Sequence, residues 1–179
     1  MNKSYSLYRT ALLIFGFSLS ILSFSIAAQN YEWPHYANNQ GSSKYAELDQ
    51  INRDTVQDLQ VAWTWNSVDN AQIEVRPRLV PAGFKSTPVQ IDGILYISTS
   101  LGNIAALDAV TGEQKWTFDT GTWEHGRPAN MGFNHRGVGY WEEESKKRII
   151  MGTNNAFLWS IDAETGLPDR SFGNEGKVD

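Results

Sequence analysis

The sequence predicts an all-β fold made of repeated four-stranded units, a partial β-propeller. Two stretches, residues 95–112 (LYISTSLGNIAALDAVTG) and 149–166 (IIMGTNNAFLWSIDAETG), align without a gap at an offset of 54 residues. Both show the alternating apolar residues of strands, and both end in the same apolar-Asp-Ala-x-Thr-Gly pattern. Repeats of about 40–50 residues are typical of propeller blades. The alternative is two ordinary hairpins that share a common turn sequence.

Residues 1–28 are predicted to be a secretory signal peptide. Lys3 and Arg9 give a positive start, residues 11–26 are largely apolar, and small residues precede a plausible cleavage point. The apolar run is shorter than the ~20 residues that a membrane-spanning helix needs, so a cleaved signal is favoured over an uncleaved anchor. We therefore expect residues 29–179 to be periplasmic or secreted, with membrane association as the alternative.

The elements that follow are predicted from local patterns. Residues 52–59 are the one segment with a helical pattern, with Asn52 or Asp54 as its N-cap. Residues 59–65 (LQVAWTW) alternate like a strand that closes a preceding blade. Each Asp-Ala-x-Thr-Gly sequence predicts a hairpin turn, because Asp accepts hydrogen bonds from the backbone ahead and Gly tolerates a positive φ. After the first turn, Trp116 is expected to start an outer strand and pack back across that turn.

Charge and length add two expectations. The segment from Glu142 to Arg148 has three acids followed by three bases, which predicts a solvated hairpin between strands. Residues 29–179 suffice for about three blades at the observed spacing, whereas propellers close with roughly 4–8. We therefore expect the front part of a longer propeller.

The composition excludes several classes of site. The absence of cysteine excludes a disulfide framework, a CxxCH haem site, a cysteine-based zinc or iron–sulfur site and a thiol nucleophile. A net charge of −5 argues against a nucleic-acid partner. The three histidines, His35, His125 and His135, lack metal-ligand spacing, and no nucleophile-elbow, P-loop or dinucleotide motif occurs. No metal site is predicted in this chain.

Beyond the repeats, the sequence resembles the exported dehydrogenases that depend on pyrroloquinoline quinone (PQQ), and most of all their glucose dehydrogenase-like branch. The matching stretches are residues 33–52, which begin Trp-Pro-His-Tyr, residues 59–65, residues 87–116, and residues 136–141, Arg-Gly-Val-Gly-Tyr-Trp. The turns alone are weak evidence because many propellers share them, but the first and last stretches together are specific. The resemblance implies an eight-bladed propeller with PQQ on its axis beside a calcium ion.

The resemblance implies three candidate cofactor-binding residues. Arg136 matches a family arginine near the PQQ carboxylates, which suit a guanidinium fork; the alternative is a structural arginine in a buried turn. Lys85 stands where relatives often have an acidic cofactor contact, so it either meets a PQQ carboxylate or is solvated. His135, which is next to Arg136, either reaches the cofactor or the mouth of the substrate site, or is structural. Asn130 and Met131 replace the adjacent cysteines of the alcohol-oxidising branch, so that disulfide is absent.

The function that the resemblance implies is oxidation of a sugar or alcohol CH–OH group. Hydride passes to PQQ, calcium polarises the quinone oxygen, and an acceptor such as a quinone or a cytochrome takes the electrons. The calcium ligands and the catalytic aspartate belong to later blades of the family and are expected beyond residue 179, so the catalytic residues are unknown. Two alternatives remain open, a non-catalytic propeller scaffold of the bacterial envelope and an inactive truncated gene product.

Overall fold

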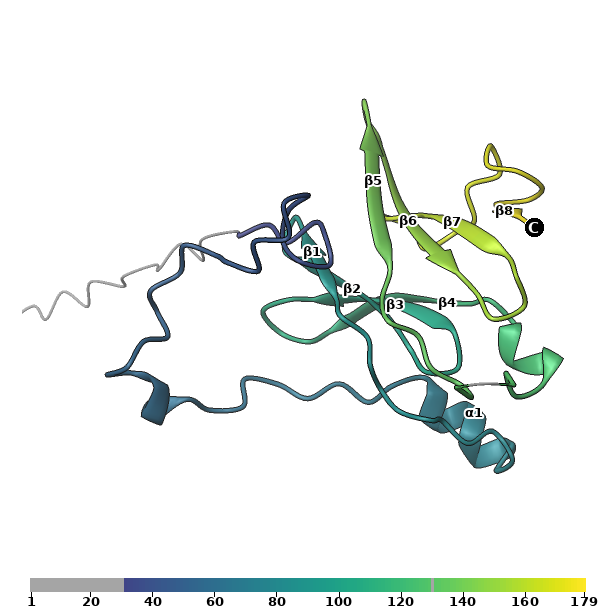
Figure 1. The fold of residues 1–179 in the computed structure, drawn as a ribbon, viewed down its shortest axis with the longest axis horizontal. Coiled ribbons are helices and arrows are strands. Elements are labelled where there is room, and N and C mark those ends of the chain that lie inside the picture. Colours follow the sequence, from purple (N-terminus) through teal and green to yellow (C-terminus); the bar gives the residue numbers. More distant parts are fainter. Residues whose placement is uncertain (1–30, 130) are drawn as a thin grey trace, which may run out of the picture.

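The computed structural model describes residues 31–129 and 131–179, so the predicted signal peptide and Asn130 lie outside the described residues. Two four-stranded antiparallel sheets dominate this part, and the strands of each follow one another in chain order (Figure 1). The predicted all-β, partial-propeller fold is therefore confirmed. Within the described ranges, no helix has the length and apolar character to cross a membrane.

The first sheet contains the first repeat copy. Its strands are β1 (Val89–Ile91), β2 (Ile94–Ser98), β3 (Asn103–Asp108) and β4 (Gln114–Asp119). Asp92 and Gly93 connect β1 to β2 with φ values of 51° and 75°, as a two-residue hairpin turn requires. In β3 every residue except Asp108 is buried, because this central strand is covered on both faces.

The second sheet contains the second copy. Its strands are β5 (Gly139–Glu143), β6 (Lys146–Gly152), β7 (Leu158–Asp162) and β8 (Lys177–Val178). The charged segment forms the β5–β6 hairpin, where Glu142 lies opposite Lys147 and Glu143 lies opposite Lys146. These acids are exposed, so the predicted solvated hairpin is confirmed. The charges occupy the strand ends as well as the turn.

The two sheets share one hydrophobic core. The Tyr96 hydroxyl donates a hydrogen bond to the Ala163 carbonyl at 3.2 Å, and the rings of Phe118 and Trp159 meet edge to face at 5.0 Å. The buried members are Val89, Ile91, Tyr96, Ile104, Ala106, Ile149, Met151, Ile161 and Ala163. The sheets thus pack on one another as neighbouring blades of a propeller do.

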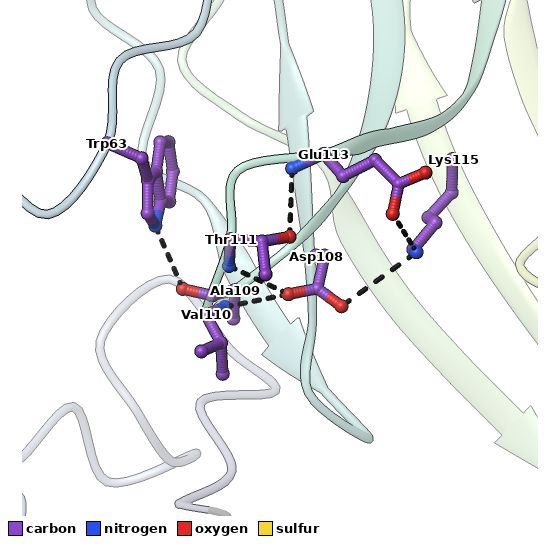
Figure 2. A network of polar contacts seen from close by, with 7 residues as sticks. All are labelled: Trp63, Asp108, Ala109, Val110, Thr111, Glu113 and Lys115. Carbon is purple, nitrogen blue, oxygen red and sulfur yellow. Dashed lines mark hydrogen bonds and ion pairs between the residues drawn. The ribbon is translucent and has the colours of Figure 1, made fainter.

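The repeated Asp-Ala-x-Thr-Gly sequences form the predicted turns. In the first turn, Asp108 Oδ1 accepts hydrogen bonds from the N–H groups of Val110 at 3.0 Å and Thr111 at 2.8 Å (Figure 2). In the second, Asp162 Oδ1 accepts from the Thr165 N–H at 2.8 Å. The same side-chain chemistry therefore closes both turns.

Each of the two turns is covered by a tryptophan from another segment of the chain. Trp63 donates from Nε1 to the Ala109 carbonyl at 3.2 Å (Figure 2), and Trp116 donates to the Ala163 carbonyl at 3.0 Å. At Gly112, a Cβ atom would lie 2.5 Å from the Trp63 ring, so only glycine admits the indole. The expectation that Trp116 packs across its own turn is wrong, because it crosses to the turn of the second sheet.

Two local expectations also fail. The helix expected over residues 52–59 is reduced to a 3-10 turn, η1 (Val56–Asp58). Residues 59–65 are not paired as a strand, since no strand lies beside them in the described part of the chain. A short helix that the sequence did not indicate, α1 (Asp69–Val75), follows this segment. Distant hydrogen bonds of Asp69 and Gln72 hold α1 in place, whereas η1 buries no residue that could extend it into a longer helix.

A second, smaller apolar cluster lies at one end of the first sheet. Ile73 of α1 and Leu79 pack against buried Leu101, Trp123 and Phe133. Trp123 belongs to η2 (Thr122–His125), a 3-10 helix that follows β4. The cluster brings the segments that precede β1 and β5 to the same end of the molecule.

Candidate functional site

The segments that lead into β1 and β5 lie side by side. Residues 81–88 precede β1 and residues 133–138 precede β5, and the Thr87 N–H donates to the Arg136 carbonyl at 2.9 Å in a parallel arrangement. This pairing places Lys85 and Arg136, two of the predicted cofactor-binding residues, on neighbouring segments.

The first of these segments has a bulge between its two contacts with the second. Between the Pro81–Phe133 and Thr87–Gly137 bridges, five residues of the first segment (82–86) face only three of the second (134–136). Lys85 lies in the longer stretch, and its side chain is exposed. It has no acidic partner within 4.0 Å in the part of the chain that the structure describes. Its ammonium group is therefore available to an anion.

Arg136 is held tightly through its backbone while its side chain stays exposed. At Gly137, where φ is +146°, a Cβ atom would lie 2.6 Å from the Thr87 carbonyl oxygen, so only glycine fits there. On the other side, His135 is buried. The Arg136 side chain is exposed and, within residues 31–129 and 131–179, pairs with no carboxylate. A free guanidinium on a fixed backbone suits the binding of a carboxylate.

The structure places His135 away from this exposed surface. Its side chain is 8% exposed, and its Nε2 atom lies 3.5 Å from Asn154 Nδ2, in the turn between β6 and β7. Burial lowers the pKa of His135, and the negative charge of Asp69 opposes that shift. The ring therefore favours its neutral form at pH 7, in which one nitrogen can accept a hydrogen bond.

Sequence reasoning missed a polar network around Asp69, which is 4% exposed. Its carboxylate accepts from the Leu101 N–H at 3.0 Å and from Asn103 Nδ2 at 2.8 Å. Gln72 accepts from the same Asn103 amide at 2.9 Å and donates to Asp119 at 2.9 Å. The network fastens α1 to the β2–β3 turn. No local signal could have found it, because the partners of Asp69 lie 32 and 34 residues away in the chain.

No metal centre is assembled from the side chains that the structure describes. Within these residues, no three His, Asp or Glu side chains converge closely enough to hold a metal ion. The two exposed cations, Arg136 and Lys85, offer chemistry for binding an anion.

The family model described as PQQ, glucose/ethanol/alcohol dehydrogenase, beta-propeller domain, matches residues 33–179. The chain belongs to this family. The matched residues include both sheets and the two segments that carry Lys85 and Arg136. The PQQ family assignment suggested by the sequence is therefore confirmed.

Curated relatives of this PQQ-family chain include sugar and alcohol dehydrogenases. The quinoprotein glucose dehydrogenase of Escherichia coli (strain K12) is 31% identical over 159 residues, which cover 81% of this chain and 19% of the relative. The quinohemoprotein alcohol dehydrogenase of Comamonas testosteroni is 32% identical over 146 residues, which cover 78% of this chain and 18% of the relative. The chain thus spans less than a fifth of the length of these relatives.

Solved structures agree with the fold. The crystal structure of the Comamonas testosteroni alcohol dehydrogenase superposes with a TM-score of 0.59 at 31% identity, covering 79% of this chain and 19% of that one. The quinohemoprotein alcohol dehydrogenase ADHIIG of Pseudomonas putida HK5 superposes with a TM-score of 0.64 at 26% identity. The superposition covers 76% of this chain and 18% of that one. This PQQ-family chain is therefore similar to a part of each of these dehydrogenases.

Proposed function

We propose that this chain is the N-terminal part of the propeller of a PQQ-dependent dehydrogenase that oxidises a sugar or an alcohol. Membership of the family and relatives named as glucose and alcohol dehydrogenases support the proposal. The observation that carries it is Arg136, an exposed guanidinium on a clamped backbone with no carboxylate partner among the described residues. The proposal places the protein in the periplasm or outside the cell, as the sequence of residues 1–28 suggests.

The cations present fit the chemistry of the cofactor. PQQ carries several carboxylates, and when bound it supplies the hydride acceptor for oxidation of a CH–OH group. Arg136 would hold one carboxylate through paired N–H donors, and Lys85 would approach as a point charge from its bulged segment. Thr87 and Gly137 hold the Arg136 backbone, so the point from which the guanidinium reaches the cofactor is fixed.

Calcium and the electron acceptor enter the proposal only through the family resemblance. Calcium takes carboxylate and carbonyl oxygens as ligands. We assign none of the described side chains to it, because none of them form a cluster of metal ligands. A quinone or a cytochrome is proposed as the electron acceptor.

The test uses the complete protein as its gene encodes it. PQQ is titrated in the presence of Ca²⁺ while tryptophan fluorescence is followed, and dye-linked oxidation of aldoses and alcohols is measured on the same sample. Arg136→Ala should weaken PQQ binding about tenfold to a hundredfold, which corresponds to one lost charge-assisted hydrogen-bonded contact. The matched control is Arg170→Ala, because Arg170 is also exposed but pairs with Glu175.

Each outcome decides a separate point. A wild-type protein that binds no PQQ and oxidises no substrate overturns the proposal and favours a scaffold. PQQ binding that is unchanged by Arg136→Ala removes Arg136 from the cofactor site.

A further inference from the structure

His135 fills the space between the turns of the two sheets. On the side of the first sheet, Gly102 lies in the β2–β3 turn with φ of +90°, and a Cβ atom there would come 3.1 Å from His135 Nε2. On the side of the second sheet, Asn154 Nδ2 lies 3.5 Å from the same nitrogen. The imidazole therefore touches both sheets at the end where the candidate site lies.

The surroundings of the ring are fixed as well. Both carboxylate oxygens of Asp69, whose charge acts on His135, are held by hydrogen bonds from Leu101 and Asn103. A neutral His135 can accept a hydrogen bond at Nε2 from the Asn154 amide. The ring thus has a packing partner on one sheet and a polar partner on the other.

Arg136 follows His135 directly in the chain, and the backbone of Arg136 and Gly137 is held by a neighbouring segment. The Arg136 carbonyl accepts from the Thr87 N–H at 2.9 Å, and Gly137 packs directly against the Thr87 carbonyl. Three consecutive residues are therefore held, and only the Arg136 side chain projects freely. The His135 ring is one of the contacts that hold the backbone from which the guanidinium projects.

We propose that His135 is a positioning residue for Arg136. By occupying the space between Gly102 and Asn154, it fixes the direction from which the guanidinium approaches the carboxylates of the cofactor. This inference rests on the proposed function, since it requires that the protein bind PQQ. In this proposal His135 acts through Arg136 rather than on the cofactor itself.

The test is a double-mutant cycle on the complete protein, with the PQQ dissociation constant measured by tryptophan fluorescence. His135→Ala should weaken PQQ binding about fivefold to tenfold in the wild-type background and should have no further effect in the Arg136→Ala background. His135→Asn, which keeps a neutral polar group for Asn154, should restore most of the affinity. Asn154→Ala, a change at an exposed side chain, should weaken binding about twofold to threefold without changing thermal stability.

The outcomes separate this inference from the proposed function. Absence of PQQ binding by the wild-type protein overturns both. Binding that is weakened additively by His135→Ala and Arg136→Ala overturns the positioning role alone, because independent effects would then act on the cofactor. If His135→Ala does not fold, the cycle is run with Asn154→Ala, and additivity there overturns the inference in the same way.

Discussion

Replacing Gly166 with alanine should destabilise the contact between the two sheets. A Cβ atom at this position would lie 2.6 Å from the Trp116 ring, and the backbone φ is +71°. The left-handed conformation costs a non-glycine residue about 1–2 kcal/mol, and overpacking costs about 1–3 kcal/mol more. The free energy of unfolding should therefore fall by about 2–5 kcal/mol, measured by chemical denaturation of the complete protein.

Gly93→Ala is the matched control for this experiment. Gly93 has a similar φ of +75°, but a Cβ atom there would meet nothing within 4 Å. Gly93→Ala should therefore cost only the conformational part, about 1–2 kcal/mol. In a Trp116→Ala background, the cost of Gly166→Ala should fall to the same value. A Gly166→Ala variant no less stable than Gly93→Ala would refute the idea that indole packing requires glycine in this turn.

Two further predictions concern buried polar groups. Burial, with nearby acids adding to it, raises the pKa of Tyr96 to about 12. The native state therefore retains the hydroxyl proton that the unfolded chain loses near pH 10, and its stability should fall by about 2–3 kcal/mol between pH 10 and pH 12. Burial also raises the pKa of Tyr140, so part of the fall at high pH remains in every variant that keeps Tyr140. Denaturation at several pH values should show a fall about 2–3 kcal/mol smaller in Tyr96→Phe than in the wild type, and an equal fall in both would contradict the assignment. Asp69→Ala should cost about 2–5 kcal/mol, because the Leu101 N–H loses its buried acceptor and Asn103 Nδ2 loses one of its two acceptors, while Asp69→Asn should cost less. A loss below about 0.5 kcal/mol for Asp69→Ala would show that water replaces the carboxylate.

Features that depend on neighbouring residues could be predicted from the sequence. Asp108 and Thr111 are three residues apart, so their hydrogen bond and the turn that it closes follow from local chemistry. The alternation of apolar residues likewise predicted the strands of both copies. The stretch at residues 33–52 and the segment around Arg136 together were sufficient to indicate the PQQ family, and the family match confirms this.

The candidate site could be predicted only in part. The resemblance identified Arg136 and Lys85, but it did not reveal that one is clamped and the other lies on a bulge. Asp69 gave no signal at all. Its role depends on a helix of 7 residues, too short for a clear period, and on partners that lie more than 30 residues away in the chain.

The hairpins, the turns and the family could be predicted without coordinates, because each depends on residues close together in the chain. Only the tertiary structure decided that Trp116 covers the turn of the following sheet, 47 residues away from its Ala163 partner. It also decided that His135 faces inward while Arg136 faces outward. Both outcomes depend on how the two sheets pack on one another, and a local pattern carries no information about that packing.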